Sequence, residues 1–297
     1  MPNNWIPLSG KWLFENNKIT FLEPQNKELP FGIALSSKTC RNGNFITNIT
    51  LTSVNSSGRI IFGYNAGSHS YFSAGLGGYN YAFLIDEYID GRGWQGLALK
   101  SSKENIQIGV PYLTNINLFG QNIILRINNV KVIQKILPHP LLGDQMGLFA
   151  WGNDKVIFEN NNFESSKPRA FIIMQFTNPY NSLYTEVIKP VSEKMGFDAI
   201  RADNIYKPGI ILNDIIQEIV ESDIIIAEIT PENANVFYEL GYAHALEKPT
   251  ILLADKDKKL PFDIAGRRCI FYDNTIKGKS DVEENLKKHL ESIKNER

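Results

Sequence analysis

Two patterns of hydrophobic and polar positions divide the chain into two parts. Up to about residue 166, short runs alternate between apolar and polar residues and are separated by Gly and Asn, as at 45–54, 81–88 and 122–136. Alternation with a period of two predicts β-strands, and many short strands predict a sandwich or barrel. Asn128 and Asn129 predict a tight hairpin turn, because Asn tolerates positive φ angles.

From residue 169 onwards, continuous apolar runs alternate with helical patterns. A repeat of strand and helix at this spacing predicts a parallel sheet with helices on both faces. We expect strands at 169–176, 197–202, 222–230, 250–254 and 269–272, and helices at 179–195, 208–221 and 233–247, followed by a terminal helix.

Local signals predict where these helices end. Gly196 should end the first helix, and Pro190 should kink or divide it. Ser280 and Glu283 form a capping-box pattern, which predicts that the terminal helix starts there. Its apolar positions are Val282, Leu286, Leu290 and Ile293.

The fold class predicted is therefore two domains. We expect an all-β sandwich at 1–163 and an α/β parallel-sheet domain at 168–297, with the boundary in NNFESSK at 161–167. A chain of 297 residues is long enough for about two domains. Charge supports the division, since residues 1–166 carry 13 Lys and Arg and 11 Asp and Glu, against 18 and 21 in the remainder.

Composition removes several classes of function. The net charge of −1 indicates no basic field, so no nucleic acid is expected as a partner. Cys40, Cys269 and the four His are scattered without metal-ligand spacing, so no metal site is expected. The N-terminus has no signal-peptide pattern and no run of about 18 apolar residues occurs, so we expect a cytoplasmic protein without a membrane partner.

The segment NVFYELGYAHAL, at 235–246, holds the strongest candidate for chemistry. It follows the apolar run at 222–230, and open α/β sheets build their ligand sites at the carboxyl ends of such strands. Glu239 lies among apolar neighbours that should raise its pKa. The competing interpretation is a glutamate on a solvated helix face. Asn233 is a good candidate for the helix N-cap.

Further motifs at ordered positions surround this segment. They are Met174, Gln175 and Phe176; Arg201, Ala202 and Asp203; Pro208 and Gly209; Asp214; Asp223; Asn233 to Gly241; His244; Lys248 and Pro249; and Pro261, Phe262 and Asp263. With them, the chain from Ala170 to Tyr272 resembles the nucleoside 2-deoxyribosyltransferase-like family and the related bacterial TIR-like domains.

The resemblance implies a flavodoxin-like domain that cleaves an N-glycosidic bond at C1′ of a ribose or deoxyribose. It assigns Glu239 as the carboxylate that stabilises or attacks the sugar, and Asp214 as the partner of the leaving base. A solvated helix-face aspartate is the alternative for Asp214. The substrate-binding residues it implies are Met174, Gln175, Phe176, Asp203, Pro208, Gly209, Glu228, Asn233, Asn235 and Tyr238.

Three positions depart from the family pattern. Gln175 and Ala234 stand where relatives often have Pro, and Glu228 stands where relatives commonly have Asp. Glu228 is the longer carboxylate and could reach differently into the pocket. We therefore expect these departures to affect the choice of substrate.

The first part is similar to concanavalin-like sandwiches of the laminin G or glucanase type, through GRIIFGYN, YAFLIDEY and GDQMGLFAWG. This similarity implies a jelly roll that binds a sugar, another small molecule or a protein. Six aromatic residues could line a concave face or belong to the core: Tyr64, Tyr71, Tyr79, Tyr81, Trp94 and Trp151. Asp86, Glu87 and Asp90 predict a solvated hairpin.

Three functions stay open. The domain could hydrolyse NAD or NADP as substrate, with no cofactor, in a prokaryotic defence effector; it could exchange bases as a deoxyribosyltransferase; or it could bind a nucleotide without turnover. A sandwich of 166 residues favours hydrolysis, because a salvage enzyme does not need it. Relatives often complete their sites across subunits, so a homo-oligomer is expected.

Overall fold

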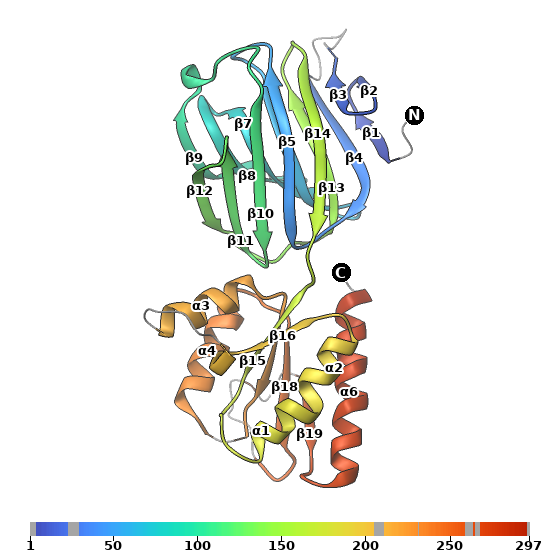
Figure 1. The fold of residues 1–297 in the computed structure, drawn as a ribbon, viewed down its shortest axis with the longest axis vertical. Coiled ribbons are helices and arrows are strands. Elements are labelled where there is room, and N and C mark those ends of the chain that lie inside the picture. Colours follow the sequence, from blue (N-terminus) through green and yellow to red (C-terminus); the bar gives the residue numbers. More distant parts are fainter. Residues whose placement is uncertain are drawn as a thin grey trace. The chain divides into compact units, whose positions relative to one another are not determined.

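A computed structural model describes residues 4–22, 30–204, 211–230, 232–258, 264 and 268–295. The chain divides into two compact units (Figure 1). The first comprises 1–137 and 141–166, and 167–297 belong to the second. No helix among the described residues is both long enough and apolar enough to span a membrane.

The first unit is a sandwich of two seven-stranded antiparallel sheets. The first sheet contains, in order, β1 (Trp5–Ser9), β4 (Phe31–Thr39), β13 (Gln145–Trp151), β6 (Ser57–Asn65), β7 (Ser70–Gly78), β8 (Tyr81–Ile89) and β9 (Gly93–Ser102). The second sheet contains, in order, β12 (Val130–Ile136), β11 (Asn122–Ile127), β10 (Tyr112–Phe119), β5 (Gly43–Leu51), β14 (Val156–Ser165), β3 (Lys18–Phe21) and β2 (Trp12–Phe14). A short 3₁₀ turn, η1 (Lys103–Asn105), follows β9. The predicted all-β sandwich is confirmed.

Alternating apolar positions build the core between the two sheets. On β5, Phe45 and Ile49 are fully buried while Asn44, Ile46 and Asn48 are half-buried, as a period of two requires. Facing residues such as Ile60 and Phe62 of β6 belong to the same cluster. The predicted hairpin between β11 and β12 is also confirmed, since Asn128 and Asn129 have φ angles of 49° and 66°.

The second unit is a five-stranded parallel sheet covered by helices on both faces, as predicted. In order, its strands are β16 (Asp198–Arg201), β15 (Arg169–Ile173), β17 (Ile224–Glu228), β18 (Thr250–Asp255) and β19 (Cys269–Tyr272). The first strand of the unit, β15, therefore has its two successors on opposite sides. Open α/β sheets bind ligands where the strand order reverses in this way.

Helices divide between the two faces of this sheet (Figure 1). One face is covered by the continuous helical segment α1 (Tyr180–Leu183), η2 (Tyr184–Ile188) and α2 (Lys189–Lys194), together with α6 (Ile276–Asn295). The other face is covered by α3 (Ile211–Glu221) and α4 (Ala234–Ala245). Another short 3₁₀ turn, η3 (Ala202–Asn204), follows β16.

Two helix signals had different outcomes. Gly196 ends its helix with a φ of 84°, and a π-helical turn directly precedes the segment that contains Pro190. The capping box at Ser280 and Glu283 is wrong, because α6 already begins at Ile276. Thr275 supplies the cap, since its Oγ1 accepts a hydrogen bond from the Gly278 amide at 3.0 Å. The predicted apolar face is correct, with Val282, Leu286 and Leu290 buried and Ile293 packed beside them.

The prediction of a solvated hairpin at Asp86 and Glu87 is wrong as well. Both side chains are buried on β8, and only Asp90 is exposed. Asp86 instead pairs with the buried Arg59 side chain.

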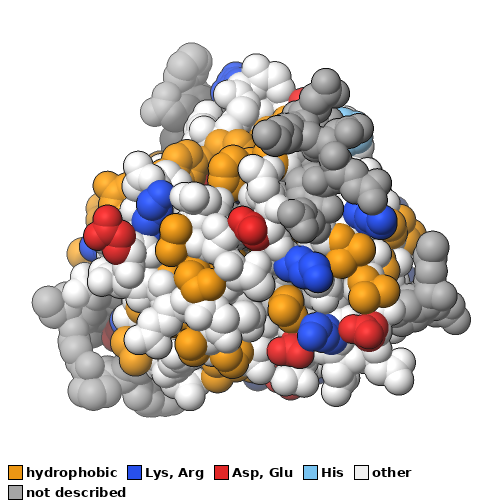
Figure 2. Space-filling view, turned by 90° about the horizontal axis from the view of Figure 1, so that it is seen from above, with side chains coloured by type: hydrophobic (Ala, Val, Ile, Leu, Met, Phe, Trp, Pro, Cys, Tyr) orange, Lys and Arg blue, Asp and Glu red, His pale blue; other side chains and the backbone are white. Residues whose placement is uncertain are grey.

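On the face of the molecule shown in Figure 2, Lys and Arg side chains lie among Asp and Glu rather than apart from them.

Candidate functional site

The carboxyl end of β17 holds a buried glutamate, Glu228. Its Oε1 accepts hydrogen bonds from the Thr230 amide at 3.1 Å, from the Thr230 hydroxyl and from Tyr272 Oη at 2.9 Å. Its Oε2 is buried and has no hydrogen-bond partner among the described residues. Glu228 is thus fixed at the sheet edge with one oxygen uncompensated, rather than extended into solvent.

Burial dominates the electrostatics around Glu228. It raises the pKa of the Glu228 carboxyl, against the hydrogen bonds from Thr230 and Tyr272, which favour the ionised form. Burial and the nearby carboxylate together raise the pKa of Tyr272, and burial raises the pKa of Tyr180 in the same way. These residues end or follow different elements of the sheet, and the topology brings them to one edge.

The predicted residues Met174 and Phe176, which follow β15, differ in their exposure to solvent. Met174 is 4% exposed and belongs to the core, whereas Phe176 is 45% exposed. The Arg201 guanidinium lies 5.1 Å from the centre of the Phe176 ring and pairs with Asp203 at 2.5 Å. Gln175 donates to Thr177 Oγ1 at 2.9 Å. Two predicted residues, Phe176 and Asp203, are thus brought together through Arg201.

The start of α4 confirms the predicted cap. Asn233 Oδ1 accepts a hydrogen bond from the Asn235 amide at 2.9 Å, so α4 begins at Ala234 without the proline of the family pattern. Asn235 is exposed, and Tyr238 is 54% exposed. The side chains of Asn235 and Tyr238 are therefore accessible at the edge where β17 ends.

Glu239 lies on α4 in a setting poor in water. Its helix buries Val236, Leu240 and Ala243 against the sheet, and Phe237 packs on the same core. Glu239 is half-buried, and this burial raises the pKa of its carboxyl to about 7. Among the described residues, no hydrogen bond or ion pair to Glu239 offsets the loss of water. A glutamate on a fully solvated helix face would not have this pKa.

Asp214 lies in the first turn of α3 and is half-buried. The helices α3 and α4 pack against each other, so both carboxylates belong to the same face of the sheet. No hydrogen bond or ion pair joins Asp214 to Glu239, both of which the structure describes. Pro208 and Gly209, together with Pro261, Phe262 and Asp263, lie outside the described residues.

A cavity of about 230 Å³ opens at the same end of the sheet, on the opposite face from α4. It is lined by the segment from Pro179 to Val187, by Tyr272 to Thr275, and by Gly278, Lys279 and Val282 of α6. None of the predicted site residues lines it, but Tyr272 connects it to Glu228. Sequence reasoning missed Tyr272 and Thr230. Their positions at or just after strand ends were the available signal.

The sandwich carries a second candidate surface, made by aromatic residues outside the main core. Tyr64, Tyr71 and Phe149 are buried in a separate cluster, with Trp94 packed beside them. Arg59 lies 5.0 Å from the centre of the Trp94 ring and pairs with buried Asp86. Of the six aromatic residues proposed for a concave face, Trp94, Tyr79 and Trp151 line a groove of about 370 Å³.

No group of three or more His, Cys, Asp and Glu among the described residues is arranged to hold a metal ion. The hydroxyls of Thr230 and Tyr272 both donate to Glu228 Oε1, so its neighbours are hydroxyls rather than a second ligand of the kind that metals prefer.

Comparison with known proteins gives likeness at the level of fold. No family model matches the sequence, and no curated protein matches it. Among solved structures, the carbohydrate-binding module CBM66 from Bacillus subtilis has a TM-score of 0.46 at 16% identity, covering 55% of this chain and 96% of that chain. A β-glucanase of Bacillus licheniformis has a TM-score of 0.40 at 10% identity, covering 56% and 94%.

A third structure is similar to a smaller part of the chain. It is the 2-deoxyribosyltransferase from Bacillus psychrosaccharolyticus, with a TM-score of 0.33 at 16% identity, covering 39% of this chain and 90% of that chain.

Proposed function

We propose that residues 167–297 form a flavodoxin-like, TIR-like or deoxyribosyltransferase-like domain that cleaves the N-glycosidic bond of NAD, NADP or a related nucleotide. One observation carries the proposal. Glu239 is a carboxyl with a pKa of about 7 on the helix that follows the central strand β17. A carboxyl with a perturbed pKa at the ligand-binding edge of an α/β sheet is a candidate for a functional site.

The chemistry requires a carboxylate below the sugar. As the bond from C1′ to the base nitrogen breaks, its electron pair leaves with the base and positive charge develops at C1′ and the ring oxygen. In its ionised form, Glu239 stabilises this charge or bonds to C1′. Water then adds to C1′, displacing the Glu239 carboxylate where a bond to it has formed, and loses a proton, which gives the free sugar. A pKa near 7 keeps a substantial ionised fraction at neutral pH.

Other residues supply positioning in this proposal. Asn235 and Tyr238 are accessible near the start of α4 and would bind the ribose hydroxyls, while Asn233 holds the cap. Phe176 would stack on the base. The Arg201 guanidinium already lies against one side of its ring, and Asp203 holds Arg201 in place. Asp214 would hydrogen-bond the leaving base. Glu228 would hold the end of β17 in place rather than contact the sugar.

Product identification tests the proposal. Full-length protein is incubated with NAD, NADP and deoxynucleosides, with and without a free acceptor base. We expect nicotinamide release from NAD or NADP, and its loss in Glu239→Gln. The matched control is Glu247→Gln, which removes an exposed carboxyl just beyond the other end of α4 and should retain full activity.

Each other outcome assigns a different function. Base exchange that depends on Glu239 supports a deoxyribosyltransferase, and saturable nucleotide binding without any product supports a non-catalytic sensor. Nicotinamide release that persists unchanged in Glu239→Gln contradicts the catalytic role of Glu239.

The sandwich has an accessory role in this proposal, as a ligand-sensing or assembly module. A homo-oligomer and a role as a prokaryotic defence effector follow from the family resemblance, and they stay predictions, as does a cytoplasmic location. Sedimentation of the purified chain, with and without NAD, tests the oligomer.

A further inference from the structure

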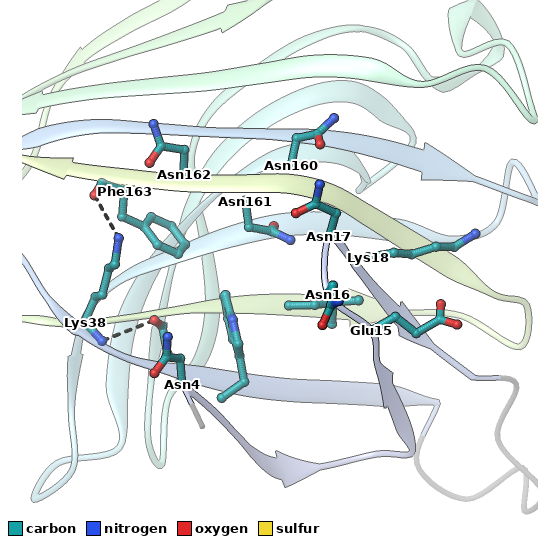
Figure 3. Close-up of a pocket in the computed structure, with 13 residues that line it drawn as sticks. Asn4, Glu15, Asn16, Asn17, Lys18, Lys38, Asn160, Asn161, Asn162 and Phe163 are labelled. Atoms are coloured by element: carbon teal, nitrogen blue, oxygen red, sulfur yellow. Dashed lines mark hydrogen bonds between the residues drawn. The ribbon is translucent and has the colours of Figure 1, made fainter. Parts of the chain in front are cut away.

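A polar cavity of about 430 Å³ opens at one edge of the sandwich, away from the aromatic groove (Figure 3). One wall comes from β1 and β4 at the edge of the first sheet, and the other comes from β14 and the turn before β3. Its volume lies within the range of roughly 300–1,000 Å³ that is typical of small-molecule sites.

A bulge in β14 shapes one wall. The pairing of β14 with β5 shifts register between Glu159 and Asn162, and Asn160 adopts a φ of 56°. The Asn160 amide donates to Asn17 O at 3.0 Å, which fixes the bulge against the turn before β3. Bulges often re-aim side chains beside binding sites. Asn160, Asn161 and Asn162 of the bulge all line the cavity (Figure 3).

Two aromatic rings form an apolar part of the lining. The centres of Trp5 and Phe163 lie 5.9 Å apart at an angle of 49°, and both rings pack against the sandwich core. Rings anchored in this way offer flat faces that suit the C–H side of a sugar ring.

Amide side chains form the polar part. Asn4, Asn16, Asn17 and Asn161 all line the cavity. Each amide offers both donors and an acceptor, and neighbouring hydroxyls of a saccharide need both. Asn161 Oδ1 is buried and has no hydrogen-bond partner among the described residues, so an acceptor is left unsatisfied at the wall of the cavity.

Charge favours a neutral ligand. The Lys38 ammonium donates to Phe163 O at 3.4 Å, and the Lys18 ammonium lies 3.9 Å from Glu159. Both lysines at the cavity thus have partners already, and Glu15 adds a negative charge to the lining. An anionic ligand would have to compete with these contacts.

We propose that this edge cavity binds a neutral saccharide, with the rings of Trp5 and Phe163 under the sugar and the amides of Asn16, Asn17 and Asn161 on its hydroxyls. The inference rests on the proposed ligand-sensing role of the sandwich and not on the chemistry of Glu239. It places the ligand at the sandwich edge rather than in the groove beside Trp94 and Trp151.

Fluorescence titration of the full-length protein tests the site, because Trp5 lies in the cavity. The probes are neutral tetrasaccharides of glucose, mannose and galactose, and a galacturonate tetrasaccharide as the charged comparison. We expect saturable binding of at least one neutral probe. Asn161→Ala and Asn16→Ala should each raise its Kd by at least about fivefold, as the loss of a hydrogen bond predicts.

A control variant separates the cavity from the aromatic groove. Trp151→Ala alters the groove, which shares no lining residue with the cavity, so it should leave Kd within about twofold. Asn16 is exposed on a turn, so its variant reports on binding even if Asn161→Ala is poorly folded.

Four results would overturn the inference: no neutral probe binds up to about 10 mM, only the galacturonate binds, the Kd of Asn16→Ala is unchanged, or Trp151→Ala abolishes binding. Failure of saccharide binding with intact nicotinamide release would leave the function proposed for Glu239 standing. Saccharide binding without nucleotide turnover would leave the cavity standing alone.

Discussion

Each unit of the protein buries carboxylates, but the two units compensate them differently. In the sandwich, Asp86 receives the Arg59 guanidinium on one oxygen and the Ser73 hydroxyl on the other. In the α/β unit, Glu228 has one oxygen without a partner among the described residues, and no hydrogen bond or ion pair in the described part of the chain offsets the burial of Glu239. Both oxygens of Asp86 are therefore compensated, whereas Glu228 and Glu239 are not fully compensated.

The difference explains why Asp86 is not a candidate for catalysis despite its burial. Arg59 is held in place by Ser57 at 2.8 Å and lies over the Trp94 and Phe149 rings. A charge with such a complete set of partners is part of the local packing. Burial of Glu228 and Glu239 costs stability and is not offset by a full set of partners. Such uncompensated burial is typical of functional sites.

Breaking the compensation in the sandwich should have the largest effect. Arg59→Met leaves Asp86 buried without its cation, and we expect the free energy of unfolding to fall by about 3–5 kcal/mol. All four Trp lie in residues 1–166, so Trp fluorescence during denaturant unfolding reports on this unit. The double variant Arg59→Met with Asp86→Leu should regain most of the loss. A single variant that unfolds like the wild type would show that Asp86 is not held by Arg59.

Removing one partner of Glu228 should have an intermediate effect. Tyr272→Phe deletes the hydroxyl that donates to Glu228 Oε1, and we expect a loss of about 1–2 kcal/mol in the α/β unit. Helical circular dichroism during unfolding measures it, while the Trp transition should stay unchanged. The control is Tyr238→Phe, whose side chain is 54% exposed and should have almost no effect. Equal free energies of unfolding for the two variants would show that the Tyr272 hydroxyl does not stabilise Glu228.

The smallest effect is expected at Glu239, and it should depend on pH. Burial raises the folded pKa to about 7, so the folded state holds its proton where the unfolded state has lost it, and stability falls as pH rises between the two pKa values. Glu239→Gln should therefore be more stable than the wild type at pH 8, by the order of 1 kcal/mol after allowance for solvent exposure, and equal to it near pH 4.

Unfolding followed by helical circular dichroism at the two pH values checks this expectation. Glu247→Gln serves as the control, since Glu247 is exposed and its variant should follow the wild type at both. A stability difference between Glu239→Gln and the wild type that does not vary with pH would mean that the folded-state pKa of Glu239 is ordinary.

Much of the secondary structure was predictable because it depends on local periodicity. The strands β15, β17, β18 and β19 and the cap at Asn233 all lie where their patterns predict. The start of α6 was not predicted, because two candidate caps lie close together and Thr275, rather than Ser280, caps the helix, which begins at Ile276. Local capping signals can indicate more than one place where a helix can begin.

The residues of the candidate site also differ in how far the sequence alone could predict them. Glu239 was identified from its neighbours in the sequence, since residues within one helical turn already form much of its surroundings. Tyr272 was not, because it lies 44 positions from Glu228 and meets it only through the order of the parallel strands. The pairing of Asp86 with Arg59 could not be predicted either, because Arg59 is 27 positions away on β6.

By itself, the sequence determined the two architectures, the order of their elements and the carboxylate at Glu239, because periodicity, caps and neighbouring side chains act over a few residues. Only the tertiary structure decided which carboxyls are compensated and which cavities exist. Hydrogen bonds, ion pairs and cavity walls join residues from distant strands, and their geometry is fixed by sheet register and strand order rather than by local sequence.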